Sequence, residues 1–554
     1  MANLTDKTFE VFDTTLRDGG QSEAVGFSVE DKLQLTEALD HLGVDFIEGG
    51  WPGANPRDDA FFEAARGLTR RHARLLAFGS TMRAGNAPAE DPVLSGLVSA
   101  RPDGVVIFGK AWDLHVELGL GIGLEENLDL IRESVAYLKA QVGLVLFDAE
   151  HFFDGYRADP EYALRTLDAA VAGGADRLVL CDTNGGSLPA QIGEAVDAVR
   201  TRFPDTVAGI HCHNDGGLAV ANSLAAVEHG VRHVQGTLNG LGERCGNADL
   251  TAILPNLILK LGYRGGALGT AELERLTATS RLVDELANRS PQNNQPFVGQ
   301  SAFAHKGGVH VSAVRKDART YEHIAPEAVG NIRRILVSDQ SGKSNIVHKL
   351  QELGLMERLE GNDAAVTQVV ERVKDLEHQG YQFEGADASF ELVVRRVIGD
   401  LPEYFRLVGF RVLDAKRHAG EAPESEATVM LEVGGERAHT AGSGNGPVNA
   451  LDHALRKALA GFYPELREMD LVDFKVRVVS AGGGTDAAVR VLIESGDGHG
   501  NWGTVGVSAN VIEASYQALV DAVTYKLAKS GRSDHLQAGD SFAERAEAGL
   551  DASR

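Results

Sequence analysis

Short runs of β-branched and aromatic residues alternate with longer helical patterns along the first half of the chain. This alternation predicts a parallel sheet, because consecutive parallel strands need a helical crossover between them. Eight such repeats in about 240 residues match a closed α/β fold, the (β/α)8 TIM barrel. An open doubly wound sheet is the alternative, but its glycine fingerprint after the first strand is missing. The expected strands are Thr8–Phe12, Phe46–Glu48, Arg74–Phe78, Gly104–Ile107, Gly143–Phe147, Arg177–Leu180, Val207–His211 and His233–Gly236. Helical candidates between them include Ser28–Leu42, Leu124–Ala140, Pro160–Gly173 and Pro189–Phe203.

Length and charge limit the class of protein. The chain has 554 residues, more than one ordinary domain, and its net charge of −25 argues against binding nucleic acid or an anionic membrane surface. No apolar run reaches the roughly 18 residues of a membrane helix, and the N-terminus lacks the pattern of a signal peptide. Three cysteines form no disulfide framework, so we expect a cytoplasmic protein. An anionic substrate would need local cations to bind against this negative field.

The chain changes character twice after the expected catalytic barrel, which we assign to residues 1–265. Residues 266–388 look mostly helical and form an expected linker region, whereas residues 389–530 return to strand patterns. The tail 531–554 is polar and expected to be mobile. The segment DQSGKSN at 339–345 resembles a phosphate-binding loop, but Val337 holds the position of the first glycine, so a helix start is favoured.

The C-terminal region contains an internal repeat. Strand patterns precede a helix near Pro447, and the same order recurs before a helix from Val511. The helices align at an offset of 64 residues, with NALDHALRKAL at 449 matching EASYQALVDAV at 513. This βββα duplication, with its Gly-rich turns GSGNGP and AGGGTD, carries no acid–base or metal chemistry, which favours a regulatory or dimerisation module over a structural appendage. The expected strands are Phe390–Val397, Tyr404–Leu413, Ala427–Val433, Leu471–Val479, Ala487–Ser495 and Trp502–Ser508.

The sequence HCHND at 211–215 ends the seventh expected strand. Side chains at i and i+2 of a strand share one face, so His211 and His213 point together while Cys212 points away. Two neutral imidazoles in a barrel mouth suit a divalent cation, with a hydrogen-bonded pair of core histidines as the alternative. Barrel closure would bring Asp18 and Asn247 from the neighbouring strand ends. This mixed nitrogen and oxygen set fits Mn²⁺, Mg²⁺ or Zn²⁺.

Other polar residues follow the strands at the end where (β/α)8 barrels carry their chemistry. Arg17 would bind a carboxylate through two hydrogen bonds, or else form a salt bridge. Thr183 could hydrogen-bond the same carboxylate, and Glu150 could act as an acid–base group or orient a catalytic water. Taken singly, a Thr or Glu at a strand end is more often structural.

Three motifs resemble those of the DRE-TIM metallolyases: FDTTLRDG at 12–19, HCHND at 211–215 and GLGERCGNADL at 240–250. They are similar in particular to the 2-isopropylmalate, homocitrate and citramalate synthases. The likeness covers nearly the whole chain, including a C-terminal module similar to that family's allosteric dimer domain. Segments such as IEGGWPGANPRD at 47–58 and DAEHFFDGY at 148–156 look like the citramalate branch. In RDGGQ, Gly20 replaces the family's usual Glu and removes a side chain near the expected oxo-acid pocket.

The resemblance implies a Claisen-type condensation of acetyl-CoA with a 2-oxo acid, followed by thioester hydrolysis. In the citramalate branch the oxo acid is pyruvate, and the products are (R)-citramalate and CoA, in isoleucine biosynthesis. The implied ligands of one divalent metal ion are Asp18, His211, His213 and Asn247. Arg17 and Thr183 would hold the oxo-acid carboxylate, with Met82 and His115 near its side chain.

The resemblance also implies residues for the remaining steps. Glu150, His310 and Tyr321 would serve the base and hydrolysis steps, with His305 as an alternative to His310. A Gly-rich loop would lie near acetyl-CoA. In this family the linker reaches over the partner subunit's barrel, which implies a homodimer, and isoleucine is the expected feedback inhibitor of the C-terminal module. The loop residues concerned are Gly240, Gly242, Glu243 and Gly246.

Four other functions compete with this interpretation. Isopropylmalate or homocitrate synthesis would keep the chemistry and use a larger oxo acid. Cleavage of the hydroxymethylglutaryl-CoA lyase type is disfavoured by the C-terminal repeat, since those lyases are essentially a barrel alone. In amidohydrolases the His-x-His pair follows the first strand, not the seventh. A non-catalytic amino-acid sensor would not need the complete set of candidate ligands.

Overall fold

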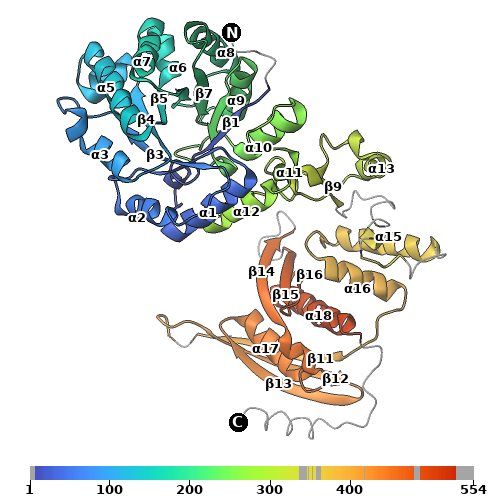
Figure 1. Ribbon diagram of the computed structural model, residues 1–554. Helices are drawn as coiled ribbons and strands as arrows, with labels where there is room; N and C mark the ends of the chain where they lie inside the picture. Colours follow the sequence, from blue (N-terminus) through green and yellow to red (C-terminus); the bar gives the residue numbers. More distant parts are fainter. Residues whose placement is uncertain are drawn as a thin grey trace. The chain divides into compact units, whose positions relative to one another are not determined.

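The computed structural model describes residues 7–335, 346, 349–351, 353–356, 363–416, 418–479 and 487–531. The chain forms two compact units (Figure 1). The first contains the chain up to Ala304 together with Glu322–Arg334, and the second contains His305–Tyr321 and the chain from Ile335 onward. The segments DQSGKSN at 339–345 and AGGGTD at 481–486, and the expected tail from residue 532, lie outside the described residues.

Parallel strands close into a barrel in the first unit. Strand β1 pairs with β2 on one side and with β8 on the other, so the sheet has no free edge. Figure 1 shows the strands enclosed by helices coloured from blue to green. The predicted (β/α)8 fold class is confirmed, and the open doubly wound sheet is excluded. The strands are β1 (Glu10–Asp13), β2 (Phe46–Gly50), β3 (Arg74–Ser80), β4 (Gly104–Lys110), β5 (Val145–Glu150), β6 (Arg177–Asp182), β7 (Val207–Cys212) and β8 (His233–Gly236).

Capping residues set the ends of the barrel helices. The Ser28 hydroxyl accepts the Asp31 N–H, and the Asp31 carboxylate accepts the Ser28 N–H, which starts the helix α1. The same helix ends at Gly43, whose φ of 98° lies in the left-handed region that glycine adopts readily. The helices around the barrel are α1 (Val29–Leu42), α2 (Pro56–Ala65), α3 (Pro92–Ser99), α4 (Asp113–His115), α5 (Leu124–Val142), α6 (Phe152–Ala158), α7 (Pro160–Gly173), α8 (Pro189–Arg202), α9 (Ala219–Glu228) and α10 (Leu250–Pro255).

Alternation along the strands divides the apolar residues between two cores. Phe12, Phe46 and Phe78 belong to a cluster inside the barrel. Val11 and Ile47, their neighbours in sequence, belong to the large core between the sheet and the helices. The interior is therefore packed with side chains, and polar groups are left to gather where the strands end.

The middle region is mostly helical, as predicted, but the first strand predicted for the C-terminal region is wrong. Phe390–Val397 lies within the helix α16. Its β-branched residues suggested a strand, yet Phe390, Val393 and Val394 recur at helical spacing and are buried together. No helix in the described part of the chain combines the length and apolar character needed to cross a bilayer. The elements of this region are α11 (Thr270–Leu273), α12 (Leu276–Leu286), β9 (Ala304–His305), α13 (Gly308–Lys316), β10 (Arg334–Ile335), α15 (Asp363–His378) and α16 (Asp387–Val397).

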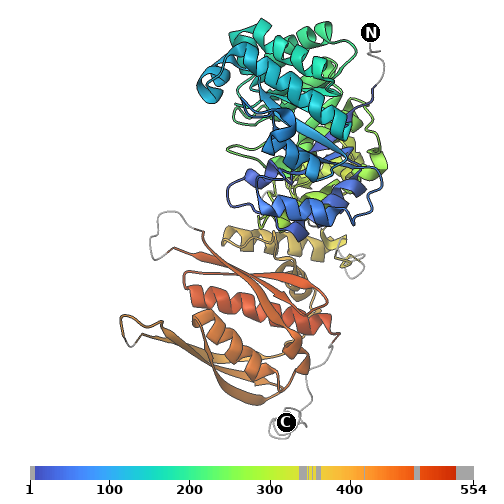
Figure 2. The ribbon, with the colours of Figure 1, turned by 60° about the vertical axis from the view of Figure 1, so that its left-hand side comes forward.

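The C-terminal part of the second unit is a duplicated βββα fold, as the sequence alignment predicted. Two antiparallel sheets of three strands each carry one helix on one face (Figures 1 and 2). The third strand of the first repeat, β13, was missed, because its sequence ERAHTAGSG is polar and small. The repeats are β11 (Arg406–Ala415), β12 (Glu424–Val433), β13 (Glu436–Gly444) and α17 (Pro447–Leu459), then β14 (Asp470–Val478), β15 (Val489–Gly496), β16 (Asn501–Ser508) and α18 (Val511–Lys529).

The two repeats share structural details. Ala454 and Leu455 of α17 and the aligned Ala518 and Leu519 of α18 are all buried in one core. The first strand of each repeat has a register irregularity at the equivalent place, between Leu407 and Gly409 and between Leu471 and Asp473. These first strands also carry large apolar side chains that are exposed. Their exposed fractions are Val408 40%, Leu413 51%, Val472 55%, Val476 46% and Val478 60%.

Candidate active site

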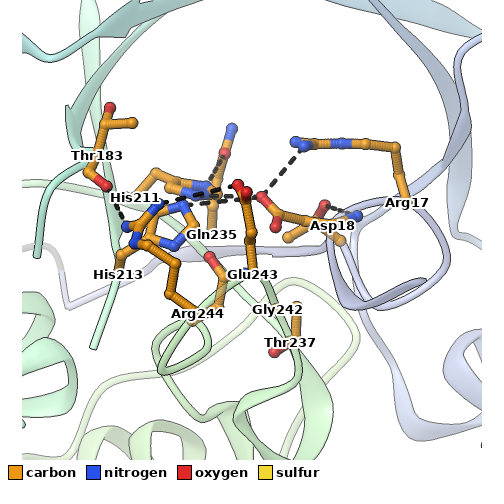
Figure 3. A network of polar contacts seen from close by, with 12 residues as sticks. Arg17, Asp18, Thr183, His211, His213, Gln235, Thr237, Gly242, Glu243 and Arg244 are labelled. Carbon is orange, nitrogen blue, oxygen red and sulfur yellow. Dashed lines mark hydrogen bonds and ion pairs between the residues drawn. The ribbon is translucent and has the colours of Figure 1, made fainter. Parts of the chain in front are cut away.

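The end of β7 and the loop after β1 bring three ligand-type side chains together (Figure 3). His211 Nε2 lies 3.6 Å from Asp18 Oδ2, and His213 Nε2 lies 4.0 Å from the same oxygen. All three side chains are buried. Among the described residues, no other set of three or more His, Cys, Asp or Glu side chains places its ligand atoms within 4.8 Å of one another. The structure thus gathers three of the four residues predicted to bind metal.

Asn247 lies beside this group because its backbone forms an antiparallel bridge with His213. Its amide nitrogen donates to the Leu241 carbonyl oxygen at 3.2 Å, and its Oδ1 has no hydrogen-bond partner. Asp18 Oδ1 and His213 Nδ1 are also buried without a partner. Buried polar atoms are rarely left unsatisfied, and an acidic oxygen, an amide oxygen and imidazole nitrogens are donors that divalent cations accept. The residues present therefore fit a metal ion.

Gln235 on β8 fixes the orientation of His211. The two residues are paired between β7 and β8, and His211 Nδ1 lies 2.9 Å from Gln235 Oε1. Gln235 Nε2 in turn donates to Asp148 Oδ1 at 3.2 Å. Because the amide oxygen accepts only from a protonated Nδ1, Nε2 of His211 keeps a free lone pair, which is the tautomer a metal ligand needs.

Arg17 lies between two carboxylates and an aromatic ring. Its Nε is 2.6 Å from Glu48 Oε2, and its Nη1 is 3.1 Å from Asp18 Oδ2. The guanidinium carbon lies 3.7 Å from the centre of the Phe78 ring. Burial works against the charge of Arg17, but Glu48 and Asp18 outweigh it and raise the pKa of the guanidinium. Arg17 is thus a fixed cation at the barrel mouth, where the chain's negative charge would otherwise repel an acid substrate.

The protonation states suit a metal site. Burial opposes ionisation of Asp18, but the charges of Arg17, His211 and His213 outweigh it and lower the pKa of the carboxyl. Burial and the neighbouring His211 lower the pKa of His213 to about 4. Near neutral pH the group therefore offers an ionised carboxylate and a neutral imidazole, the forms that bind cations.

A cavity of about 250 Å³ opens over these residues. Arg17, Glu150 and Thr183 line it together with the ligand group. Trp51, Phe78 and Phe108 form an aromatic wall, with ring centres 5.5–5.8 Å apart. Gly20 lines a neighbouring cavity that shares Arg17 and Trp51, and a Cβ there would meet only the Phe27 ring at 3.8 Å. The glycine thus leaves open space beside Arg17.

Two predicted pocket residues lie elsewhere. Met82 is buried, and its N–H donates to the Ser134 hydroxyl at 2.9 Å. His115 packs against Trp112 and His151, with ring centres 5.1 and 4.1 Å away. Neither Met82 nor His115 is among the residues that line the cavity. Lys110 forms an ion pair with the cavity residue Glu150.

The Gly-rich loop after β8 lines a second cavity, of about 570 Å³, together with Asn247 and Arg289. Gly240 and Gly246 have φ values of 63° and 90°, which glycine adopts readily. A Cβ on Gly242 would lie 2.2 Å from the Asn247 side-chain nitrogen, so only glycine fits there. Glu243 differs from these three glycines, because it lines the cavity over the ligand group and not the second cavity.

His310 and Tyr321 lie in the second unit. Their rings stack with centres 4.2 Å apart and an interplanar angle of 29°. Tyr321 is 45% exposed, whereas His305, the alternative to His310, is buried. The structure therefore brings His310 and Tyr321 together as a pair.

Sequence reasoning missed the supporting residues Glu48 and Gln235. Glu48 ends the second expected strand and has no local pattern that indicates a role, yet it is fully buried and binds both Arg17 and the Thr14 hydroxyl. Gln235 lies inside the expected eighth strand, and its polar side chain at an interior position was a usable sign. What the sequence could not give was the strand register that places it beside His211.

Known protein families match the chain in three consecutive parts. The HMGL-like family matches residues 8–283 and the homocitrate synthase post-HMGL domain-like family matches residues 297–381. The LeuA allosteric (dimerisation) domain matches residues 384–527.

Relatives match along almost the whole length. A protein named (R)-citramalate synthase from Geobacter sulfurreducens is 54% identical over 521 residues, which cover 94% of this chain and 98% of the relative. Another of the same name from Aquifex aeolicus is 54% identical, covering 95% and 99%. A probable 2-isopropylmalate synthase from Methanopyrus kandleri is 36% identical, covering 94% and 99%.

Proposed function

The chain belongs to the (R)-citramalate synthase family, and from that premise we propose how its residues carry out the condensation of acetyl-CoA with pyruvate. The reaction consumes water and gives (R)-citramalate and CoA. One observation carries the assignment of the site: partnerless buried donor atoms of Asp18, His213 and Asn247 gather at the strand ends beside the fixed cation Arg17. This arrangement suits a small acid that is chelated by a metal ion and forms an ion pair with Arg17.

We propose that Asp18, His211, His213 and Asn247 hold one divalent ion, Mn²⁺, Mg²⁺ or Zn²⁺. When bound, the ion would act as a Lewis acid toward the pyruvate ketone. Arg17 would pair with the pyruvate carboxylate, and Glu48 keeps its guanidinium aimed at the cavity. The Thr183 hydroxyl would donate to the same carboxylate and fix its orientation.

We propose that acetyl-CoA lies against the loop of Gly240, Gly242, Glu243 and Gly246, whose cavity could hold part of a large cofactor. Glu150, His310 and Tyr321 would serve proton removal from the acetyl methyl and the later hydrolysis. Lys110 holds the Glu150 carboxylate in the barrel mouth, and the stacking of His310 on Tyr321 is consistent with a shared role. The exposed Tyr321 hydroxyl is free to move a proton to or from a substrate atom.

We further propose a homodimer that uses the first strands of the duplicated βββα fold. The match to a LeuA allosteric (dimerisation) domain and the exposed valines and leucine of β11 and β14 support this. Isoleucine is the proposed feedback inhibitor bound by that region. We keep the division into 1–265, 266–388, 389–530 and 531–554 as a proposal, and we place the enzyme in the cytoplasm, in keeping with its three free cysteines.

The decisive experiment follows thiol release from acetyl-CoA with Mn²⁺ or Mg²⁺ present. Pyruvate, 2-oxobutyrate, 2-oxoisovalerate and 2-oxoglutarate are offered in parallel. We expect pyruvate to give the highest kcat/KM. A preference for 2-oxoisovalerate would preserve the site and overturn the substrate, whereas no release with any oxo acid from metal-loaded protein would overturn the condensation.

A further inference from the structure

His151, directly after β5, has an unusual backbone. Its φ of 58° and ψ of 31° lie in the left-handed region, which non-glycine residues rarely adopt. Strain of this kind persists only where the surroundings enforce it, and it concentrates at functional sites. His151 adjoins the proposed catalytic Glu150, and the residue is almost fully buried, at 8% exposed.

At this left-handed turn the backbone N–H of His151 points at a cavity residue. This N–H donates to the Thr183 hydroxyl oxygen at 2.9 Å. A threonine hydroxyl has a single proton to donate. With a lone pair of the oxygen occupied by the amide, the hydroxyl proton is directed away from His151, and Thr183 lines the cavity over the ligand group. The amide therefore presets Thr183 as a donor toward a bound carboxylate.

The His151 side chain is held from two sides. Its Nδ1 lies 3.3 Å from Asp154 Oδ2, and Asp154 is itself fixed by Asn184 Nδ2 at 2.9 Å and by an Arg157 nitrogen at 2.7 Å. On its other side the ring packs against His115, with centres 4.1 Å apart. A glycine would adopt this backbone without strain, so the turn itself does not require an imidazole.

We propose that His151 is a positioning residue: its anchored ring keeps the left-handed backbone in place, and that backbone orients Thr183 toward the pyruvate carboxylate. The inference rests on the proposed function, since it assumes that Thr183 binds this carboxylate. The His115 ring, which packs against His151, would support the same arrangement.

The test compares variants of the full-length, metal-loaded enzyme. His151→Val disfavours the left-handed backbone, whereas His151→Asn loses the imidazole but tolerates that backbone. We expect His151→Val to raise the KM for pyruvate about tenfold, the effect of one misplaced hydrogen bond to a charged group. The KM for acetyl-CoA should change less than twofold, and His151→Asn should recover most of the loss. Asp154→Ala should raise the KM for pyruvate by an intermediate factor.

Two controls separate positioning from general damage. Arg101 is a second non-glycine residue with a left-handed backbone, φ 52°, and it lies outside the site. Arg101→Val should lower the melting temperature without changing either KM. In the Thr183→Val background, His151→Val should add nothing further to the KM for pyruvate, because the hydroxyl it orients is gone.

The proposal is overturned if folded His151→Val keeps the wild-type KM for pyruvate, or if its effect multiplies with that of Thr183→Val. If His151→Val does not fold, Asp154→Ala decides in the same way. Wild-type enzyme that prefers another oxo acid would instead overturn the proposed substrate, and the same variants would then be compared with that acid.

Discussion

In most proteins charged side chains are exposed and large apolar side chains are buried. The barrel and the duplicated βββα fold depart from this pattern in opposite directions. The barrel buries charged groups at its strand ends, including Asp18, Glu48 and Asp148. The duplicated fold exposes apolar groups on β11 and β14, such as Val472 and Val476. Buried charge and exposed apolar surface are the two observations that point to a missing partner. The buried charges belong to the proposed metal and pyruvate site, and the exposed apolar side chains belong to the proposed dimer interface.

The largest expected effect comes from breaking the charge arrangement of the barrel. His211→Ala removes a proposed ligand and should reduce kcat by roughly 10³-fold, with loss of bound metal measured by elemental analysis. The matched control is His229→Ala, since His229 is exposed and its side chain forms an ion pair with Asp197 at 3.0 Å. Full metal content in His211→Ala would contradict the ligand assignment.

Gln235→Leu should have a smaller effect on the same site. It keeps the shape of the side chain but removes the oxygen that selects the His211 tautomer. We expect Mn²⁺ affinity to fall about 10–100-fold, as for other residues that orient metal ligands. Titration of metal-free protein with Mn²⁺ would measure this, and unchanged affinity would show that His211 needs no such support.

On the other side of the comparison, Val476→Asp places a charge on the exposed apolar strand β14. If that strand is an interface, the dimer should weaken by about 2 kcal/mol, or roughly 30-fold in its dissociation constant. Analytical ultracentrifugation would measure it. Val171→Asp, at a similarly exposed valine on a barrel helix, should leave association unchanged. Equal dimer stability in both variants would remove β14 from the interface.

The smallest effect concerns acid stability at the opposite end of the barrel. Burial opposes ionisation of Glu10, but hydrogen bonds to Arg177 and His233 outweigh it and lower its pKa to about 2. A lowered carboxyl pKa stabilises the fold above the ordinary value of 4.5 and loses that contribution as the pH falls toward 2. Glu10→Gln should therefore cost about 1 kcal/mol at pH 7 and almost nothing near pH 2. Urea unfolding at both values would test this, and a difference independent of pH would contradict it.

The fold could be predicted where the spacing of apolar residues along the sequence clearly indicated a strand or a helix. All eight barrel strands were expected, because each is a short apolar run bounded by helical patterns. The failures lie in the second unit. The run Phe390–Val397 has β-branched residues in a helical arrangement, and local propensity yields to tertiary packing there. Strand β13 has a polar sequence and is recognised as a strand through its pairing with β12.

The residues of the candidate site also fall into those that the sequence predicts and those that it does not. Asp18, His211 and His213 could be predicted from the sequence, because they are typical metal ligands and directly follow strands. Supporting residues could not, since their role depends on contacts between strands or on backbone conformation. Gln235 acts through its register with His211, and His151 acts through a left-handed φ. Neither property has a local sequence pattern.

The register irregularity repeated in β11 and β14 changes the edge of each three-stranded sheet. Both strands lie at the edge of their three-stranded sheets in the described parts of the chain and display apolar side chains, which together form a template for open-ended strand addition. A bulge interrupts the ladder and twists the edge. Because the irregularity lies at the same position in both repeats, neither edge strand offers a continuous, flat ladder for the addition of a further strand.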